Sequence, residues 1–453
     1  MKPTSLDALI RRARGVGEVA VLAPGGGWSA DMLAAAAVVE PLERAKAAGS
    51  VALCCHDPLR FLIALTALDG IAGRLLLLPD DLSPAMVSEL AARSQVRAIL
   101  TDRQDLADGE TIHWTDPIDR ALSSTPATPA RTVATRWIFA TSGTTGSPKL
   151  VDHDLSGLCT GVRTRPGEAW RWGQMYGPAR FAGVQVMVQA LAQGVLLLPD
   201  PDWPPARRLA FLKAEGCTAM SATPTLWRKI LMTPASDGLA LRQITLGGEI
   251  ADGGVLAALQ RRFPEARISH VYASTEAGAS FAITDGLPGF PAAMLDRPGA
   301  GPALKLVDGR LLIRSARGRR TYVGSTAAYA DDEGFVDTGD MVEQAGDRCL
   351  FRGRANGAIN VGGDKLYPQE VEAVLLAHPD VAFARIHARS NPITGQIVIA
   401  EVVARDDAAH AGTLTRTLQT HCAQHLPRWK CPAAIRLVPQ VAADASGKIG
   451  RTA

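Results

Sequence analysis

Short apolar segments of strand length alternate with helix-length segments through most of this chain. Strands are predicted at residues 50–54, 75–78, 195–198 and 218–220, and helices at 58–68 and 206–214. Strands that alternate with helices in this way build βαβ units around a parallel sheet. The larger part of the chain is therefore predicted to be α/β.

The pattern changes near residue 304. Residues 303–307 and 310–314 have strand-like alternation on both sides of Asp308 and Gly309, a dipeptide typical of two-residue hairpin turns. Residues 334–342 and 348–352 predict a further antiparallel pair. This section is therefore expected to be β-rich.

The last 97 residues, 357–453, are long enough for a small domain of their own. Helices are predicted there at 368–377 and 411–426, and a strand pair at 381–387 and 397–403. We therefore expect a large N-terminal domain over residues 1–355, with βαβ-type subdomains and a β-rich section. A small, mobile α+β domain is expected over residues 356–453.

The charges are nearly balanced. Lys and Arg number 48 against 45 Asp and Glu, a net charge of +3 without a block of like charges. This excludes a basic arm for nucleic acid. Trp170 and Trp172, next to the arginines of 163–171, could stack on bases, but a surface loop is favoured for this single cluster. No nucleic acid is expected among the partners.

The longest aliphatic run, residues 32–39, has eight residues, whereas a membrane-spanning helix needs roughly 20. No membrane span is expected, and Asp7 near the start argues against a signal peptide, so a cytoplasmic location is predicted. The seven cysteines include no CxxC pair, which favours reduced thiols. His421 and His425 have i, i+4 spacing, but no third zinc ligand is evident.

The most informative segment is 137–149, where an apolar strand leads into hydroxyl residues and glycines closed by Lys149. Glycines let backbone N–H groups face an anion, hydroxyls donate further hydrogen bonds, and the ammonium offsets charge. The segment therefore suits a polyphosphate, the alternative being an ordinary surface turn. Its spacing is not that of the Walker loop, because Gly143 and Gly146 are too close together and Pro148 precedes the lysine.

Five segments in order resemble the motifs of the adenylate-forming superfamily of acyl-CoA synthetases, adenylation domains and luciferases. They are the loop at 137–149; residues 272–276, similar to YGxTE; 337–340, similar to (Y/D)TGD; 352–354 with 359–372, similar to the hinge and GGxxxxPxEVE; and 446–451, similar to SGKxxR. The resemblance implies the fold of that superfamily and the activity of an AMP-forming acid–thiol ligase. Such an enzyme joins a carboxylic acid to ATP as an acyl-adenylate, releases pyrophosphate, and passes the acyl group to a pantetheine thiol.

The resemblance also implies a nucleotide site. The phosphate loop would hold the β- and γ-phosphates of ATP through Thr141, Ser142, Gly143, Thr144, Thr145, Gly146 and Lys149. Tyr272 would offer a flat face to adenine, and Asp340 would accept hydrogen bonds from both ribose hydroxyls. Arg354 is the planar cation expected nearby.

Three residues would take part in adenylation itself. Thr275 would donate to the α-phosphate, and the Glu276 carboxylate would bind Mg²⁺, a hard cation that prefers oxygen ligands. Lys448, near the C-terminus, would enter the site and stabilise the pentavalent transition state. ATP and Mg²⁺ are thus the expected cofactors.

Asn356 stands where the family keeps a hinge residue, commonly Asp or Lys, and Gly357 beside it adds backbone freedom. The small domain would swing there, presenting Lys448 for adenylation. It would then present the face of Gly362 and Gly363 for thioester formation, because a thin pantetheine arm can pass close to the backbone of glycines. The acceptor is expected to be CoA or a carrier protein, a choice that the sequence leaves open.

The acid pocket is expected at Arg180 and Phe181 together with Gly247, Gly248 and Glu249. Arg180 would bind a hydroxyl or second acidic group, Phe181 would suit an aromatic ring or acyl chain, and which of the two lines the pocket stays open. A compact aryl acid such as a hydroxybenzoate is favoured, because the large domain looks short for a long-chain fatty-acid enzyme. The alternatives are a fatty acyl-CoA or acyl-carrier-protein ligase, a stand-alone amino-acid adenylation enzyme, and a nucleotide-binding protein without catalysis.

Overall fold

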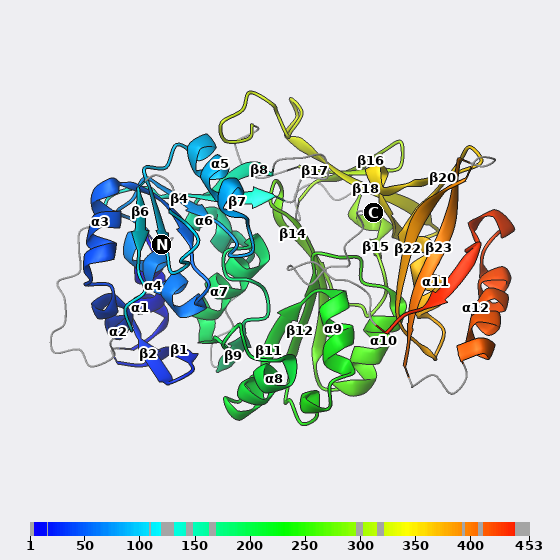
Figure 1. Cartoon of the computed structure of the whole chain (residues 1–453), viewed down its shortest axis with the longest axis horizontal. Helices are drawn as coiled ribbons and strands as arrows, with labels where there is room; N and C mark the ends of the chain where they lie inside the picture. The colour runs from blue at the N-terminus through cyan, green and yellow to red at the C-terminus, as the bar shows by residue number, and fades with distance from the viewer. Residues whose placement is uncertain are drawn as a thin grey trace.

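The computed structural model describes residues 4–15, 17–107, 110–118, 131–141, 148–162, 169–295, 302–314, 321–391, 395–405 and 411–439. In this part of the chain the strands form four sheets. Figure 1 shows the molecule extending from a blue N-terminal part, through a green centre, to a small orange and red C-terminal part.

The first sheet has six strands in the order β6-β5-β3-β4-β7-β8. They are β3 (Ser50–Cys54), β4 (Arg74–Leu77), β5 (Ala98–Thr101), β6 (Thr111–His113), β7 (Arg136–Thr141) and β8 (Lys149–His153). Neighbours are parallel except β7 and β8, which form an antiparallel hairpin. This sheet lies at the N-terminal end of the molecule, and its last hairpin holds the two ends of the predicted phosphate loop.

Helices cover both faces of the first sheet. Helices α3 (Glu40–Ala48) and α4 (Pro58–Leu68) pack on one face, and α5 (Pro84–Ser94) packs on the other. Helix α4 is apolar on nearly every side and buried along its length, and the Asp57 carboxylate caps its start by accepting the backbone N–H of Leu59 at 2.8 Å. The predicted strand 50–54 and helix 58–68 are confirmed.

The second sheet has eight strands in the order β14-β13-β12-β11-β9-β10-β1-β2. They are β1 (Val19–Ala23), β2 (Gly26–Ser29), β9 (Trp170–Gly173), β10 (Gly194–Leu197), β11 (Ala219–Ala222), β12 (Gln243–Gly247), β13 (Arg267–Ser274) and β14 (Gly278–Ile283). Only the edge strands β2 and β14 are antiparallel to their neighbours. The accompanying helices are α1 (Leu6–Ala13), α2 (Ala30–Ala36), α6 (Leu155–Leu158), α7 (Phe181–Gln193), α8 (Pro205–Ala214), α9 (Pro224–Leu231) and α10 (Gly253–Arg262). The predicted α/β organisation is confirmed.

The expectation of a surface loop at Trp170 and Trp172 is wrong. Both residues lie in β9, an interior strand between β10 and β11, and are only 7% and 6% exposed. Their spacing of two puts both rings on one face of the strand, where they lie 6.3 Å apart. The neighbouring arginines obscured a two-residue alternation that marks a buried strand.

The third sheet has the order β15-β19-β18-β17-β16. Its strands are β15 (Phe290–Pro291), β16 (Leu304–Val307), β17 (Arg310–Arg314), β18 (Phe335–Ala345) and β19 (Arg348–Arg354). The predicted hairpin is confirmed: Asp308 and Gly309 have φ of 49° and 74°, as a two-residue turn of this kind requires. The predicted antiparallel pair that follows is also confirmed as β18 and β19.

The fourth sheet belongs to the C-terminal part. It contains β20 (Ile359–Val361), β21 (Asp364–Leu366), β22 (Val381–Asn391), β23 (Gly395–Ala404) and β24 (Ala434–Leu437), and it packs with α11 (Pro368–Leu376) and α12 (Ala411–His425). The helices and strand pair predicted for this region are confirmed. Its core is a hydrophobic cluster of its own, but the boundary at 355/356 stays a prediction.

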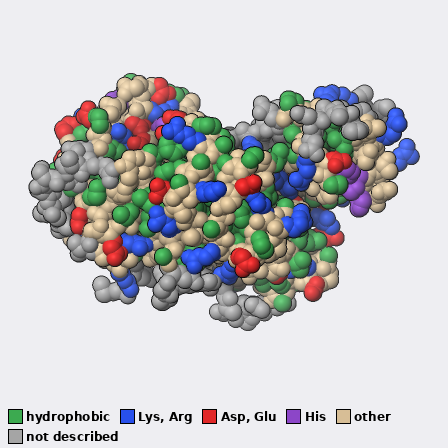
Figure 2. Space-filling model, turned by 90° about the horizontal axis from the view of Figure 1, so that it is seen from below, with side chains coloured by type: hydrophobic (Ala, Val, Ile, Leu, Met, Phe, Trp, Pro, Cys, Tyr) green, Lys and Arg blue, Asp and Glu red, His purple; other side chains and the backbone are tan. Residues whose placement is uncertain are grey.

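The surface and cysteines add three observations. Figure 2 shows Lys and Arg side chains interspersed with Asp and Glu on one face of the molecule. Among the described residues no helix combines the length and apolar character that crossing a membrane requires. The seven cysteines are free, and burial raises the pKa of the Cys54 thiol to about 11, so this thiol fills space rather than acting as a nucleophile at neutral pH.

Candidate active site

The turn between β13 and β14 carries two predicted catalytic residues. Thr275 and Glu276 follow the end of β13, and the Ser274 hydroxyl in the same turn accepts the backbone N–H of Ala277 at 3.0 Å. The backbone carbonyl of Thr275 lies 2.8 Å from Nε2 of His153 on β8. This contact ties a turn of the second sheet to the edge of the first.

Asp340 and Arg354 meet in the third sheet. They are register partners on β18 and β19, and Arg354 Nε lies 3.4 Å from Asp340 Oδ1. Arg354 also donates to the backbone carbonyl of Thr338 at 2.6 Å. The Tyr272 hydroxyl donates to the other carboxylate oxygen, Oδ2 of Asp340. Three predicted nucleotide-binding residues from two sheets are thus brought together.

The ring of Tyr272 packs against other aromatic rings. It stacks on Phe281 and Phe351 with centroids 5.2 and 5.3 Å away and interplanar angles of 10° and 2°. The flat surface predicted to receive adenine therefore meets protein side chains in this arrangement. Stacking on adenine would require the ring to turn or a phenylalanine to give way, and this role of Tyr272 stays a prediction.

The two ends of the predicted phosphate loop lie together. Thr141 and Lys149 are paired across the β7–β8 hairpin, and the loop residues Ser142, Gly143, Thr144, Thr145 and Gly146 lie outside the described residues. The Lys149 ammonium lies 4.8 Å from the ring centroid of Tyr322, and the Tyr322 hydroxyl lies 3.4 Å from Oε1 of Glu276. One side chain thus connects the predicted phosphate-binding lysine to the predicted metal-binding carboxylate.

Two tyrosines at the site are uncharged donors. Burial, with the Asp340 carboxylate adding to it, raises the pKa of Tyr272 well above its usual range. Burial and the Glu276 carboxylate likewise raise the pKa of Tyr322. Both phenols therefore stay protonated at neutral pH and donate hydrogen bonds to the neighbouring carboxylates.

The two residues expected to begin the acid pocket point to different partners. Phe181 begins α7, and its ring centroid lies 5.4 Å from Phe139 and 4.9 Å from His153. Arg180, just before it, donates to Oδ2 of Asp81 at 2.7 Å. Phe181 therefore joins an aromatic cluster, whereas Arg180 is paired with a carboxylate that the sequence patterns did not single out.

The other predicted acid-pocket segment follows β12. The carbonyl of Gly247 accepts a hydrogen bond from the Tyr176 hydroxyl at 3.2 Å. Glu249 Oε2 accepts the backbone N–H of Thr225 at 2.9 Å, so this carboxylate helps to hold the start of α9. Gly248 lies between them, and a contact of any of the three with an acid stays a prediction.

Three predicted features lie in the C-terminal part. Asn356 is in a short 3₁₀ turn, Ala355–Gly357, immediately after β19. Gly362 and Gly363 close the β20–β21 hairpin with φ of 63° and 101°, and open space surrounds the position of an added Cβ at each. The turn geometry already accounts for two glycines, and their open side leaves room for a ligand. Lys448 lies outside the described residues.

The sequence patterns missed three side chains of this site. His153 could have been found, since the two-residue period of β8 puts it on the same face as Lys149. Phe139 lies on the strand before the phosphate loop and could have been selected in the same way. No local pattern points to Tyr322, because its position depends on how the segment before β18 packs against β8.

Comparisons with known proteins agree with this arrangement. A family model described as AMP-binding enzyme matches residues 32–318, and one described as AMP-binding enzyme C-terminal domain matches residues 370–448. The first match alone covers more than half of the chain. The chain therefore belongs to the AMP-binding family of adenylate-forming enzymes, and the resemblance noted from the motifs is confirmed.

Individual relatives are more distant. The 2-succinylbenzoate–CoA ligase of Bacillus licheniformis is 24% identical over 89% of this chain and 88% of the ligase. Phosphinothricin tripeptide synthetase PhsB of Streptomyces viridochromogenes is 26% identical over 89% of this chain but only 37% of the synthetase. The crystal structure of the anthranilate CoA ligase AuaEII with anthranoyl-AMP has a TM-score of 0.82 at 18% identity, covering 98% of this chain and 95% of that chain. The adenylate-forming fold is thereby confirmed.

The family defines the general chemistry. The chain is an AMP-forming acid–thiol ligase by its family, and ATP-dependent formation of an acyl-adenylate from a carboxylic acid is the reaction typical of that family. The predicted ligase class and the use of ATP follow from this.

Proposed function

We propose that this chain activates a small aryl acid with ATP, releases pyrophosphate, and transfers the acyl group to a pantetheine thiol to give a thioester and AMP. The observation that carries the proposal is the meeting of three sheets around one set of side chains. Lys149 of the first sheet and Glu276 in the turn after β13 both contact Tyr322. Strand β13 of the second sheet also carries Tyr272, which donates to Asp340 of the third sheet, the register partner of Arg354.

The first half-reaction joins two anions. A carboxylate oxygen bonds to the α-phosphorus of ATP while the bond from that phosphorus to the bridging oxygen breaks, and pyrophosphate leaves with the electron pair. Cations must offset the charge, and Lys149, Arg354 and Lys448 are the residues proposed to do so. Asp340 would hold the ribose once its hydrogen bond from Tyr272 is exchanged for bonds from the sugar hydroxyls.

The residues present fit a magnesium ion. One oxygen of Glu276 is near the Tyr322 hydroxyl, which leaves the second oxygen for a cation. The described residues contain no group of three His, Cys, Asp or Glu side chains able to hold a metal. Mg²⁺ is commonly bound by one or two carboxylates together with substrate phosphates and water, so Glu276 with ATP would suffice. Bound there, Mg²⁺ would offset the charge on the phosphates of ATP.

An aryl acid is supported by the aromatic cluster of Phe139, His153 and Phe181. Phe139 and His153 are buried and hold the partly exposed ring of Phe181 in edge and tilted contact, and an aromatic acid would pack against Phe181. A hydroxybenzoate is the representative we propose, with Arg180 near the pocket mouth to meet a ring substituent. The names of the succinylbenzoate and anthranilate ligases support the same class of acid, whereas the peptide synthetase relative favours an amino acid as the second candidate.

The second half-reaction needs a thiol. We place the pantetheine arm beside Gly362 and Gly363, whose open side would let it approach the backbone. The domain of residues 356–453 would rotate at Asn356 between the two half-reactions. The thiolate sulfur then bonds to the acyl carbon, and the bond from that carbon to AMP breaks.

The test of adenylation is exchange of labelled pyrophosphate into ATP across a panel of hydroxybenzoates, fatty acids and amino acids. We expect exchange to depend on a hydroxybenzoate and to be lost in Lys448→Ala. If none of the acids in the panel supports exchange, the proposal is overturned. Near-equal exchange with long-chain fatty acids would overturn the choice of an aryl acid, and selective exchange with an amino acid would favour the second candidate.

The acceptor is tested separately by supplying CoA or a phosphopantetheinylated carrier protein to the pre-formed adenylate. Formation of a thioester with one of them identifies the physiological thiol class. Failure with both, while exchange persists, would contradict the thioester-forming step only.

A further inference from the structure

Tyr322 lies outside all five motifs, yet it contacts two residues of the proposed site. Its hydroxyl is 3.4 Å from Oε1 of Glu276, and the Lys149 ammonium is 4.8 Å from its ring centroid. No ion pair joins Lys149 directly to Glu276, and neither forms one with any other described residue. A protonated phenol thus separates a cation and an anion that would otherwise attract each other.

The backbone that carries Tyr322 is held from both sides. Val323 donates its N–H to the carbonyl of Leu150 at 2.8 Å, so this segment extends the exposed edge of the first sheet at β8. Gly324 has φ of +73°, and a Cβ added there would lie 2.7 Å from the carbonyl oxygen of Arg93. The position of Tyr322 is therefore determined by contacts with β8 and with the C-terminal end of α5.

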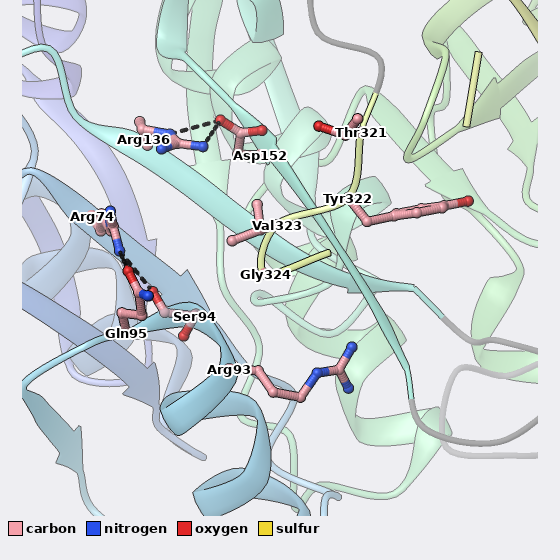
Figure 3. A pocket seen from close by; sticks show the side chains of 10 residues that line it. All are labelled: Arg74, Arg93, Ser94, Gln95, Arg136, Asp152, Thr321, Tyr322, Val323 and Gly324. Atoms are coloured by element: carbon pink, nitrogen blue, oxygen red, sulfur yellow. Dashed lines mark hydrogen bonds and ion pairs between the residues drawn. The ribbon is translucent and has the colours of Figure 1, made fainter. Parts of the chain in front are cut away.

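Behind this segment lies a cavity of about 220 Å³, lined by Arg74, Arg93, Arg136 and Asp152 among others. Arg136 is paired with Asp152, and Arg74 donates to the carbonyl of Ser94 at 3.2 Å. Figure 3 shows the ring of Tyr322 extending away from Arg74 and Arg136. The phenol therefore points away from these two arginines and toward Lys149 and Glu276.

We propose that Tyr322 is a positioning residue for adenylation: its hydroxyl orients the Glu276 carboxylate toward the metal, and its ring keeps Lys149 apart from that carboxylate. The inference rests on the proposed function. A hydrogen bond to one carboxylate oxygen fixes the rotamer in which the other oxygen can bind a cation. The negative face of the ring attracts the ammonium, which stays available to the phosphates of ATP instead of pairing with Glu276.

The two roles are separable because Tyr322→Phe removes only the hydroxyl, whereas Tyr322→Leu removes the ring as well. In Tyr322→Phe we expect the Mg²⁺ concentration for half-maximal pyrophosphate exchange to rise about tenfold or more, as for other groups that orient a metal ligand. ATP binding measured by calorimetry in EDTA should not change. In Tyr322→Leu, that metal-free affinity should also fall about two- to fivefold, because the contact with Lys149 is lost.

Tyr329→Phe is the matched control, since its ring lies 5.1 Å from that of Tyr322, whereas the tyrosine hydroxyl beside Glu276 is that of Tyr322. It should leave both measurements unchanged. Binding of Mn²⁺ to the ATP complex, followed by electron paramagnetic resonance, gives a readout that is independent of turnover and should weaken in Tyr322→Phe. An unchanged Mg²⁺ dependence in Tyr322→Phe, or an equal shift in Tyr329→Phe, would overturn the inference. If wild-type protein shows no acid-dependent exchange, the proposed function fails, and the calorimetric and Mn²⁺ measurements still decide the role of Tyr322.

Discussion

The proposed nucleotide side and the proposed acid side of the site are built differently. On the nucleotide side, Asp340 finds Arg354 by strand register, and Tyr272 donates to the same carboxylate. On the acid side, Arg180 pairs with Asp81 in the loop between β4 and α5, 99 residues away in the chain. The ribose end of the nucleotide side is thus assembled by residues of the recognised motifs, whereas the paired residues Arg180 and Asp81 belong to no motif. No motif therefore predicts how the proposed acid side is assembled.

The largest effect is expected on the nucleotide side, from Asp340→Ala. Losing two hydrogen bonds from ribose to a charged acceptor should cost about 4 kcal/mol, or roughly a 1,000-fold loss in the rate of acid-dependent exchange at low ATP. Asp337, in the same motif, is the matched control, because it is half exposed and pairs with Arg310. Asp337→Ala should change exchange by less than about threefold. Equal losses in the two variants would show that the motif acts through folding and not through ribose.

The next effect tests whether the nucleotide side stays assembled while the small domain moves. Asn356→Pro fixes φ at about −65° beside the predicted hinge. Misplacing the small domain in the second half-reaction should slow overall thioester formation about 100-fold, with pyrophosphate exchange and ATP binding affected much less. Asn356→Gly, which retains backbone freedom, should stay near wild type. Equal loss of both half-reactions and of ATP binding in the proline variant would contradict a hinge at this residue.

The acid side is probed by Arg180→Met. If the guanidinium binds a ring hydroxyl, this variant should raise the KM for a hydroxybenzoate about tenfold. That factor corresponds to the loss of one hydrogen bond to a charged group, roughly 1.5 kcal/mol. The KM for ATP should not change. Unsubstituted benzoate is the control substrate and should be insensitive. Asp81→Asn, which weakens the ion pair that competes for Arg180, should lower the KM for the hydroxybenzoate. An equal rise in KM for both acids would mean that Arg180 only supports the structure of the pocket and does not bind the ring hydroxyl.

The same contrast explains what the sequence could predict. Strand runs and the Asp308-Gly309 hairpin are local, so periodicity and turn residues located them correctly, whereas the roles of the motif residues stay predictions. Trp170 and Trp172 were misplaced because flanking arginines outweighed a short strand pattern, although β9 lies inside a sheet. The pairing of Arg180 with Asp81 and the contact of Tyr322 with Glu276 depend on how separate parts of the fold pack together. The sequence around each of these residues does not indicate its partner.

The smallest effect is a pH-dependent one at His56, close in the fold to Asp81, the partner of Arg180. His56 Nδ1 lies 2.6 Å from Asp80, next to Asp81, and its Nε2 lies 3.0 Å from Asp202 in the loop after β10, so it joins the first sheet to the second. Burial lowers the pKa of His56, but the hydrogen bonds and charges of Asp80 and Asp202 outweigh it, and the net shift is upward.

A raised pKa in the folded state means that the stabilising charge is fully present below the unfolded value near 6.5 and is lost as the pH rises through the folded value. Because the ring is 43% exposed, solvent screening limits the effect to roughly one degree in Tm. His56→Gln should therefore melt slightly below wild type at pH 6 and together with it at pH 9, measured by thermal unfolding at low salt. His113→Gln, at an exposed histidine of β6 without an ion pair among the described residues, should show no such pH dependence. A deficit of His56→Gln that persists unchanged at pH 9 would show that His56 stabilises the fold by packing and not by its charge.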